Sequence, residues 1–254
     1  MTLYVYAVTA DPVLPETEGV DRTMQFGAVE AGNLAAVFSR VTDEEFSQDV
    51  IDRRAADLEW LGAIGYRHQD VVAALMKQTA IVPLRAFTLF SSEEAVRAYL
   101  LEHAELLRKV LERLAGRQEW TLRVEFEPQR WSESLVGRIE SLRALQDDIA
   151  AATPGKAFLL RKKLDDEKKR ASRDAEQQVV SEIERRVLEK LVCETVSESR
   201  ERRDGAFPQI NVLVNRDEES LLQELHEELG RTYEQEGVTL ALTGPWPPYT
   251  FAHV

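Results

Sequence analysis

One stretch of the chain constrains the fold more than any other, because it contains neither glycine nor proline from residue 156 to about residue 203. Such a stretch permits a helix of roughly forty residues or more, on the order of 65 Å long at 1.5 Å per residue. Its two ends carry apolar residues, whereas its middle, DDEKKRASRDAEQQ, offers only two alanines to a core. We therefore expect a long charged helical arm over 156–203. Its middle is a solvated surface, a loose turn between two helices or a surface for a partner.

The first 115 residues mix strand and helix patterns. Four segments have strand-like composition: 3–10, 24–30, 34–40 and 80–90. The first is apolar on both alternating faces, which is typical of a buried strand. Pro83 indicates an edge, a bulge or an end in the fourth. Apolar residues recur at helical spacing from about Ser47, and Ser92 is a predicted N-cap of a further helix. These elements predict an N-terminal α+β domain over 1–115.

The rest of the chain predicts a second domain over 116–254. Strand patterns lie at 119–127, 207–214 and 238–246, and helical patterns outside the arm lie at 134–152 and 218–236. The resulting order is strand, helix, long helix, strand, helix, strand. This order is close to a ferredoxin-like plait in which one strand is moved or replaced. The predicted fold class is therefore α+β with two domains, the second a modified ferredoxin-like plait.

Composition excludes several classes of function. The formal net charge of −13 disfavours electrostatic binding of nucleic acid or of an anionic membrane. Cys193 is the single cysteine, so the chain can form neither an intrachain disulfide nor a multi-cysteine metal site. The N-terminal segment lacks the basic start of a signal peptide, and no apolar run is long enough to span a bilayer. We expect a cytoplasmic protein.

Catalytic and cofactor motifs are missing from the sequence. No two of the four histidines stand at i and i+4, and TPGKAFLL lacks both the first glycine and the hydroxyl residue of a phosphate-binding loop. His68 is interpreted as structural or surface-exposed, and Cys193 as a small buried residue on the apolar stripe of the arm. The sequence therefore predicts no catalytic residue, no cofactor and no metal.

The segment LTGPWPPYTF at 242–251 places three prolines and three aromatic residues next to the chain end. Gly244 permits a sharp exit from a strand, and the prolines restrict the path that follows. Trp246, Tyr249 and Phe251 can then clamp the tail onto the protein. Two interpretations stay open: an anchored terminus that closes the junction of two domains, or a preformed aromatic surface for a partner.

Three stretches read together resemble the gas vesicle protein GvpL/GvpF family. They are HQDVVAALMKQTAIVPLRAFTLF at 68–90, GKAFLLRKKLD at 155–165 and the tail LTGPWPPYTF. The tail is the most specific of the three. One departure concerns the central strand, where the family commonly has Arg-Phe-Gly-Thr and this chain has Arg85 followed by Ala86, Phe87 and Thr88. The lost glycine suggests a different backbone or packing detail, and it leaves the F and L subgroups open.

The resemblance implies a non-enzymatic accessory or minor structural protein of gas vesicle formation. It implies two α+β domains, the second a modified ferredoxin-like fold, and contact with the small hydrophobic shell protein, with other gas vesicle accessory proteins as further candidate partners. Candidate partner-facing or motif positions are Arg85, Trp246, Tyr249 and Phe251. The expected location is cytoplasmic, in association with gas vesicles. The alternatives are a ligand-binding regulatory α+β protein and an enzyme centred on His68 and Arg85.

Overall fold

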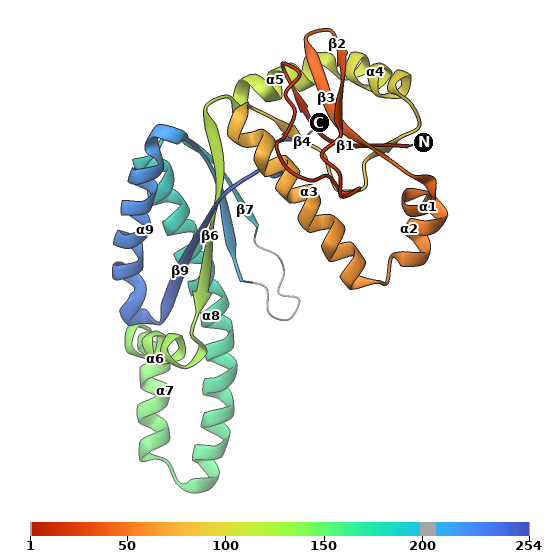
Figure 1. Ribbon diagram of the computed structural model, residues 1–254. Helices are drawn as coiled ribbons and strands as arrows, with labels where there is room; N and C mark the ends of the chain where they lie inside the picture. The colour runs from red at the N-terminus through yellow and green to blue at the C-terminus, as the bar shows by residue number, and fades with distance from the viewer. Residues whose placement is uncertain (1, 199–206, 254) are drawn as a thin grey trace. The chain divides into compact units, whose positions relative to one another are not determined.

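The computed structural model describes residues 2–198 and 207–253, and its chain divides into two compact units. The N-terminal unit comprises Met1–Glu119 and Pro245–Val254, and the C-terminal unit comprises Trp120–Gly244. Each unit combines helices with a sheet (Figure 1). The sequence-based boundary after residue 115 lies close to this division. The last ten residues, however, group with the N-terminal unit and not with the segment that precedes them.

The sheet of the N-terminal unit is built around its first strand. Its strands are β1 (Thr2–Thr9), β2 (Phe26–Ala31), β3 (Leu34–Val41), β4 (Val82–Pro83) and β5 (Leu89–Phe90). The order is β2-β3-β1-β4, and β5 also pairs with β1. All residues of β1 after Thr2 are buried, as the apolar pattern of this segment predicts. β2 and β3 pair antiparallel and form a hairpin.

The single strand expected at 80–90 is in fact two short strands. β4 pairs with β1 through Ala7 and Val8, and β5 pairs with it through Leu3 and Tyr4. Between them the chain turns, and the Thr88 amide donates to the Arg85 carbonyl at 3.2 Å. β4 ends at Pro83, which has no N–H to continue a ladder.

Helices cover the sheet of the N-terminal unit. They are α1 (Asp43–Phe46), α2 (Gln48–Arg54), α3 (Leu58–Gln78), α4 (Glu93–Glu102) and α5 (Ala104–Leu114). α3 contributes Val71, Val72 and Leu75 to the same buried cluster as Tyr4 and Tyr6 of β1. The alternate residues of β1 point to the opposite face of the sheet, where α4 and α5 contact the strands. The predicted N-cap is confirmed, because Ser92 Oγ accepts from the Ala95 amide at 3.2 Å.

The C-terminal unit contains a second sheet and four α-helices among its described residues. Its strands are β6 (Arg117–Phe126), β7 (Cys193–Glu198), β8 (Gln209–Asn215) and β9 (Val238–Trp246), in the order β7-β8-β6-β9. Its α-helices are α6 (Pro128–Arg138), α7 (Glu140–Ala151), α8 (Pro154–Lys190) and α9 (Glu219–Tyr233). Single 3-10 turns flank α9 at Arg216–Glu218 and Glu234–Glu236.

The long helix is real, but the predicted arm over 156–203 is wrong in its last part. α8 is continuous for 37 residues and ends at Lys190. Cys193–Glu198 then forms β7, which pairs antiparallel with β8, so Cys193 lies on a strand and is only half-buried. Thr195 and Val196 are β-branched, and they suit a strand at the edge of β8 better than a further helical turn. Residues 199–203 of the predicted arm lie outside the described residues.

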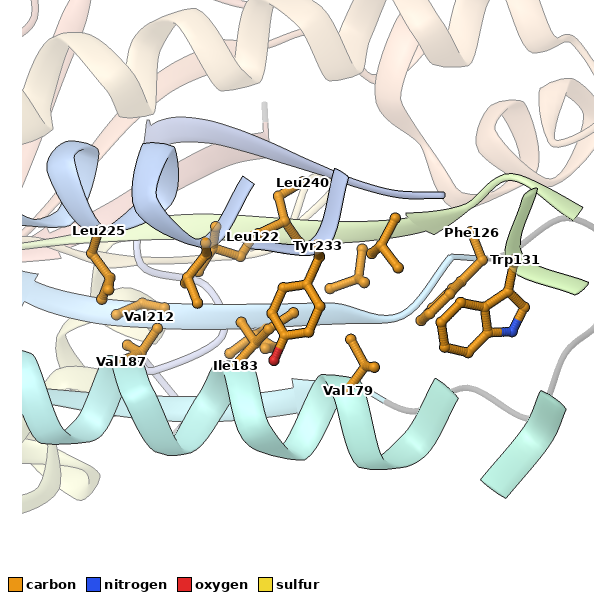
Figure 2. Packing of buried hydrophobic residues seen from close by; sticks show 14 of the residues in the cluster. Leu122, Phe126, Trp131, Val179, Ile183, Val187, Val212, Leu225, Tyr233 and Leu240 are labelled. Atoms are coloured by element: carbon orange, nitrogen blue, oxygen red, sulfur yellow. The ribbon is translucent and has the colours of Figure 1, made fainter. Parts of the chain in front are cut away.

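The middle of α8 is neither a loose turn nor wholly solvated. Ala171 and Ala175 pack against the buried cluster of the C-terminal unit, and α6 and α7 both contact α8. Farther along, Val179, Ile183 and Val187 point from α8 toward the strands (Figure 2). The small residues bring the helices close together, and the larger ones fill the space beneath the sheet.

Candidate functional site around His68 and the C-terminal tail

The tail does not leave its strand at Gly244, as the sequence suggested, because β9 continues through Gly244 to Trp246. Gly244 adopts φ 142°, which residues with a Cβ rarely adopt. Pro247 and Pro248 are buried, as is Phe251, which is 3% exposed. Tyr249 is half-buried and packs against the same cluster as β1 and α3. Trp246, by contrast, is 43% exposed. The tail is therefore anchored in the N-terminal unit mainly by the residues after Trp246.

Hydrogen bonds hold the tail as well as apolar contacts. The Thr250 amide donates to Oε2 of the buried Glu119 at 3.1 Å, and the Thr250 hydroxyl donates to Oε1 at 2.7 Å. The guanidinium of Arg113 donates to the carbonyl of Phe251. These bonds connect a buried carboxylate and a tail carbonyl to the N-terminal unit, and they offset part of the hydration that both groups lose on burial.

His68 of α3 lies at the centre of the site and is 3% exposed. Its Nε2 is 3.1 Å from the Leu84 carbonyl oxygen and 3.0 Å from the Tyr249 hydroxyl, and its Nδ1 is 3.2 Å from the Tyr4 hydroxyl. A carbonyl oxygen can only accept, so Nε2 carries the proton in the neutral ring. Nδ1 then accepts from Tyr4, whose oxygen accepts in turn from the Phe87 amide at 2.9 Å. The Leu84 carbonyl therefore fixes the tautomer of His68, and the tautomer fixes the direction of the hydrogen bonds from Tyr4 and from the Phe87 amide.

Aromatic rings enclose the imidazole. The Tyr6 ring stacks on His68 with centroids 5.6 Å apart and an interplanar angle of 27°, and Tyr4 approaches it edge-on at 5.7 Å. The Tyr6 hydroxyl is 2.8 Å from Ser39 Oγ and accepts from the Val20 amide at 3.0 Å. Each buried polar atom named here thus has a partner, as a stable interior requires.

Burial keeps this cluster uncharged near neutral pH. Loss of hydration lowers the pKa of His68 to about 4, and the bond to Leu84 offsets only part of that effect. Burial likewise raises the pKa of Tyr6 to about 12 and the pKa values of Tyr4 and Tyr249 well above the usual range. A neutral imidazole with both nitrogens engaged has the properties of a packing element that ties the tail to β1 and α3.

The four candidate positions differ in how far their side chains are exposed to solvent. Tyr249 and Phe251 point into the N-terminal unit, whereas the side chains of Arg85 and Trp246 are exposed. Arg85 begins the turn after β4, and its carbonyl accepts from the Thr88 hydroxyl at 2.7 Å. The exposed guanidinium of Arg85 and the enclosed imidazole of His68 do not share an open site.

Phe87 occupies the position at which the sequence departs from the family pattern. Its φ is 65°, in the left-handed region that glycine adopts most readily. The Phe87 ring packs 5.4 Å from that of Trp60 and 6.3 Å from that of Tyr4. The turn therefore has a backbone that suits glycine, held in place by aromatic contacts and by the bond from the Phe87 amide to Tyr4.

Sequence reasoning missed the partners of the tail. Tyr4 and Tyr6 lie on one face of β1, and this alternation was a usable signal of a shared environment. Glu119 gave no signal, because an acidic residue in a strand is usually solvated.

The second family motif, GKAFLLRKKLD at 155–165, lies at the start of α8 and presents apolar side chains to solvent. Phe158 and Leu159, on the first turns of α8, are 68% and 67% exposed.

The described residues offer neither a metal centre nor a membrane-spanning helix. They contain no group of three or more histidine, cysteine, aspartate or glutamate side chains placed to hold a metal ion. Within the same residues, no helix combines the length and the apolar character needed to cross a membrane.

Comparison with known proteins identifies the family. The family model described as gas vesicle synthesis protein GvpL/GvpF matches residues 2–253. The chain belongs to the GvpL/GvpF family. Gas vesicle protein L of Streptomyces sp. strain CB03234 is 31% identical over 263 residues, covering 99% of this chain and 92% of the relative. Gas vesicle protein L of Haloferax mediterranei is 28% identical over 253 residues, covering 93% and 73%.

Solved structures show the same fold for GvpL/GvpF proteins. GvpF from Microcystis aeruginosa matches with a TM-score of 0.69 at 14% identity, covering 100% of this chain and 99% of the other. GvpF from Anabaena sp. PCC7120 matches with a TM-score of 0.71 at 16% identity, covering 100% and 96%. The resemblance seen in the sequence is thereby confirmed. This GvpL/GvpF protein takes part in gas vesicle formation and has a mixed helix and sheet fold.

Proposed function

We propose that this GvpL/GvpF protein binds the hydrophobic shell protein of gas vesicles and assists its assembly, without catalysis. The observation that carries the proposal is the family match from residue 2 to residue 253, because it includes both units and the tail. Other gas vesicle accessory proteins are further proposed partners, and the proposed location is the cytoplasm at the vesicle. The neutral, fully engaged His68 supports the non-catalytic part of the proposal.

Exposed apolar side chains are the proposed contacts for the shell protein. Phe158 and Leu159 are neighbours in sequence, and both are more than half exposed. Trp246 presents an aromatic ring at the start of the tail, and Arg85 offers an exposed guanidinium for a carboxylate or carbonyl of the partner. Covering apolar side chains on both partners removes their surface from water and stabilises a complex.

The proposed architecture has two domains that correspond to the two compact units. We infer that the C-terminal unit is a modified ferredoxin-like plait. The strand order β7-β8-β6-β9 supports this inference, as does the chain order of one strand, helices, two strands, a helix and a final strand. In this proposal three successive helices, α6, α7 and α8, replace the first crossover helix.

Co-expression with the shell protein tests the proposal. We expect the shell protein to stay soluble and to co-purify with the wild-type chain. Replacing Phe158 and Leu159 by serine, or Trp246 by alanine, should reduce the recovered shell protein while the variant melts at the wild-type temperature. Leu101→Ser, at another exposed leucine, is the matched control and should bind normally.

Aggregation of the shell protein beside a folded wild-type chain would contradict direct binding. The ligand-binding regulatory alternative would then be tested next. If only the Trp246→Ala variant lost binding, the aromatic tail, and not the start of α8, would be the contact.

A further inference from the structure

A groove between α6 and α8 lies within the C-terminal unit and is not used by any function described so far. Its volume is about 300 Å³, close to the lower limit for pockets that bind small ligands or side chains. The lining residues are Phe126, Pro128, Trp131, Ser132, Leu135, Lys168, Lys169, Ser172, Arg173 and Glu176. We propose that this groove binds an acidic helical segment of a partner protein, with an apolar side chain of the segment inserted between the two helices.

The wall of the groove on the side of α6 is apolar. Phe126 and Trp131 are buried neighbours whose ring centroids are 4.8 Å apart, and Figure 2 shows them side by side at one end of the cluster. Leu135 lies one helical turn beyond Trp131 and is also buried. This wall can accept an apolar side chain without leaving polar atoms unpaired.

The rim on the side of α8 is cationic. Three of the four ionisable residues that line the groove are basic, against one carboxylate, in a chain whose net charge is −13. Lys169 and Arg173 are exposed, and Lys168 is half-buried. In the part of the chain that the structure describes, none of these three cations belongs to an ion pair. They are therefore available to carboxylates of a partner, which they also attract over several ångströms.

The floor of the groove determines how a partner would be oriented. The Trp131 indole N–H donates to Ser172 Oγ at 3.0 Å, and the Ser172 hydroxyl donates to Glu176 Oε1 at 2.6 Å. The buried Glu176 places negative charge at the bottom, so a small free anion is disfavoured there. A partner must present its apolar side chain to the floor and its carboxylates to the rim. An acidic amphipathic helix has this arrangement, and two packed helices offer a groove for its ridge of side chains.

The test uses the full-length chain and a fluorescein-labelled synthetic peptide of glutamate, leucine and alanine that forms an amphipathic helix. Fluorescence anisotropy should show saturable binding, and a peptide with lysine in place of glutamate should bind at least about tenfold more weakly. Lys169→Glu combined with Arg173→Glu should weaken binding by about tenfold or more. Arg161→Glu combined with Lys162→Glu makes the same charge change upstream on α8, outside the groove, and should change it less than about threefold.

A second variant separates the groove from simple charge attraction. Ser132→Phe keeps the charge and places a ring in the groove, so it should abolish saturable binding of the acidic peptide. Circular dichroism checks that each variant is folded. Failure of the wild-type chain to bind the peptide would overturn the proposal, as would equal weakening by the two charge reversals or undiminished binding to the Ser132→Phe variant.

Sedimentation of the chain alone tests another occupant. A dimer that the Lys169 and Arg173 reversals dissociate would mean that a second copy fills the groove, and the proposal of a separate partner would be wrong. A monomer that binds the acidic peptide supports it.

Discussion

At the scale of single residues, Phe87 combines an unfavourable backbone with favourable ring contacts. A φ of 65° costs a residue with a Cβ roughly 1–2 kcal/mol relative to glycine. We predict that Phe87→Gly is more stable than Phe87→Ala by about 1 kcal/mol, and that both are less stable than the wild type because they lose the contacts with Trp60 and Tyr4. Urea unfolding measures the free energies of unfolding of the wild type and the two variants. If Phe87→Ala were at least as stable as Phe87→Gly, the backbone at residue 87 would not be strained.

His68 makes the stability of the protein depend on pH. The pKa of His68 is about 4 in the folded protein and 6.5 for an ordinary histidine in the unfolded chain, so the unfolded chain takes up the proton first as pH falls. The contribution of the neutral ring is complete above pH 6.5 and is lost between about pH 6.5 and pH 4, a change of about 3 kcal/mol. We predict that His68→Gln loses less free energy of unfolding between pH 7.5 and pH 5 than the wild type.

Urea unfolding at the two pH values measures this difference for His68. His103→Gln, outside the cluster, controls for the effect of replacing a histidine elsewhere in the chain. If the His68→Gln variant lost as much stability as the wild type, the imidazole would not be the titrating group.

The sequence identified several site residues singly but not as a group. His68 and Tyr249 both stood out in the sequence, yet they are 181 positions apart, and no local pattern joins them. The hydrogen bond between them depends on where the tail returns, which is set by packing against β1 and α3. The exposed Trp246 and the packed Tyr249 also look alike in sequence, since both are aromatic residues next to proline.

At the scale of elements, the sequence predicted the types of most helices and strands but not all of their ends. The absence of glycine and proline permits a helix without requiring one, so α8 stops at Lys190 and β7 follows. Pairing with β8 decides this, and a partner strand later in the chain is not visible in local periodicity. In the same way, the helical pattern at 134–152 predicts one helix, but the extended backbone of Ile139 separates α6 from α7.

Two glycines of the C-terminal unit have opposite predicted responses to alanine. Gly230 lies inside α9 with open space where a Cβ would stand, so Gly230→Ala should stabilise the protein by up to about 1 kcal/mol. Gly237 has φ 78°, and a Cβ there would lie 2.6 Å from Arg130 Cβ and 2.9 Å from the Trp131 amide nitrogen. Gly237→Ala should therefore destabilise it by about 2 kcal/mol or more. Thermal melts should show a raised melting temperature for Gly230→Ala and a lowered one for Gly237→Ala. Equal shifts of the melting temperature in the two variants would contradict the different surroundings of the two glycines.

At the scale of the whole molecule, the last residues of the chain stabilise its first unit. The α+β class followed from alternating helix and strand periods. The return of the tail did not, because its contacts join residues that are distant in sequence. Phe251 is buried in the N-terminal unit, Thr250 bonds to Glu119, and Tyr249 bonds to His68. The tail is therefore part of the core of that unit and more than a flexible end.

Deletion of residues 247–254 tests this role. Loss of Phe251 burial alone should cost about 1.5–3 kcal/mol, and the loss of the two hydrogen bonds from Thr250 to Glu119 adds to that cost. We predict faster hydrogen exchange in β1, whereas exchange in β8 of the C-terminal unit should change little. Trp246→Ala in the full-length chain is the control and should have a smaller effect, because Trp246 is 43% exposed whereas Phe251 is 3% exposed. Equal loss of protection in β1 and β8 would mean that the tail stabilises both units alike.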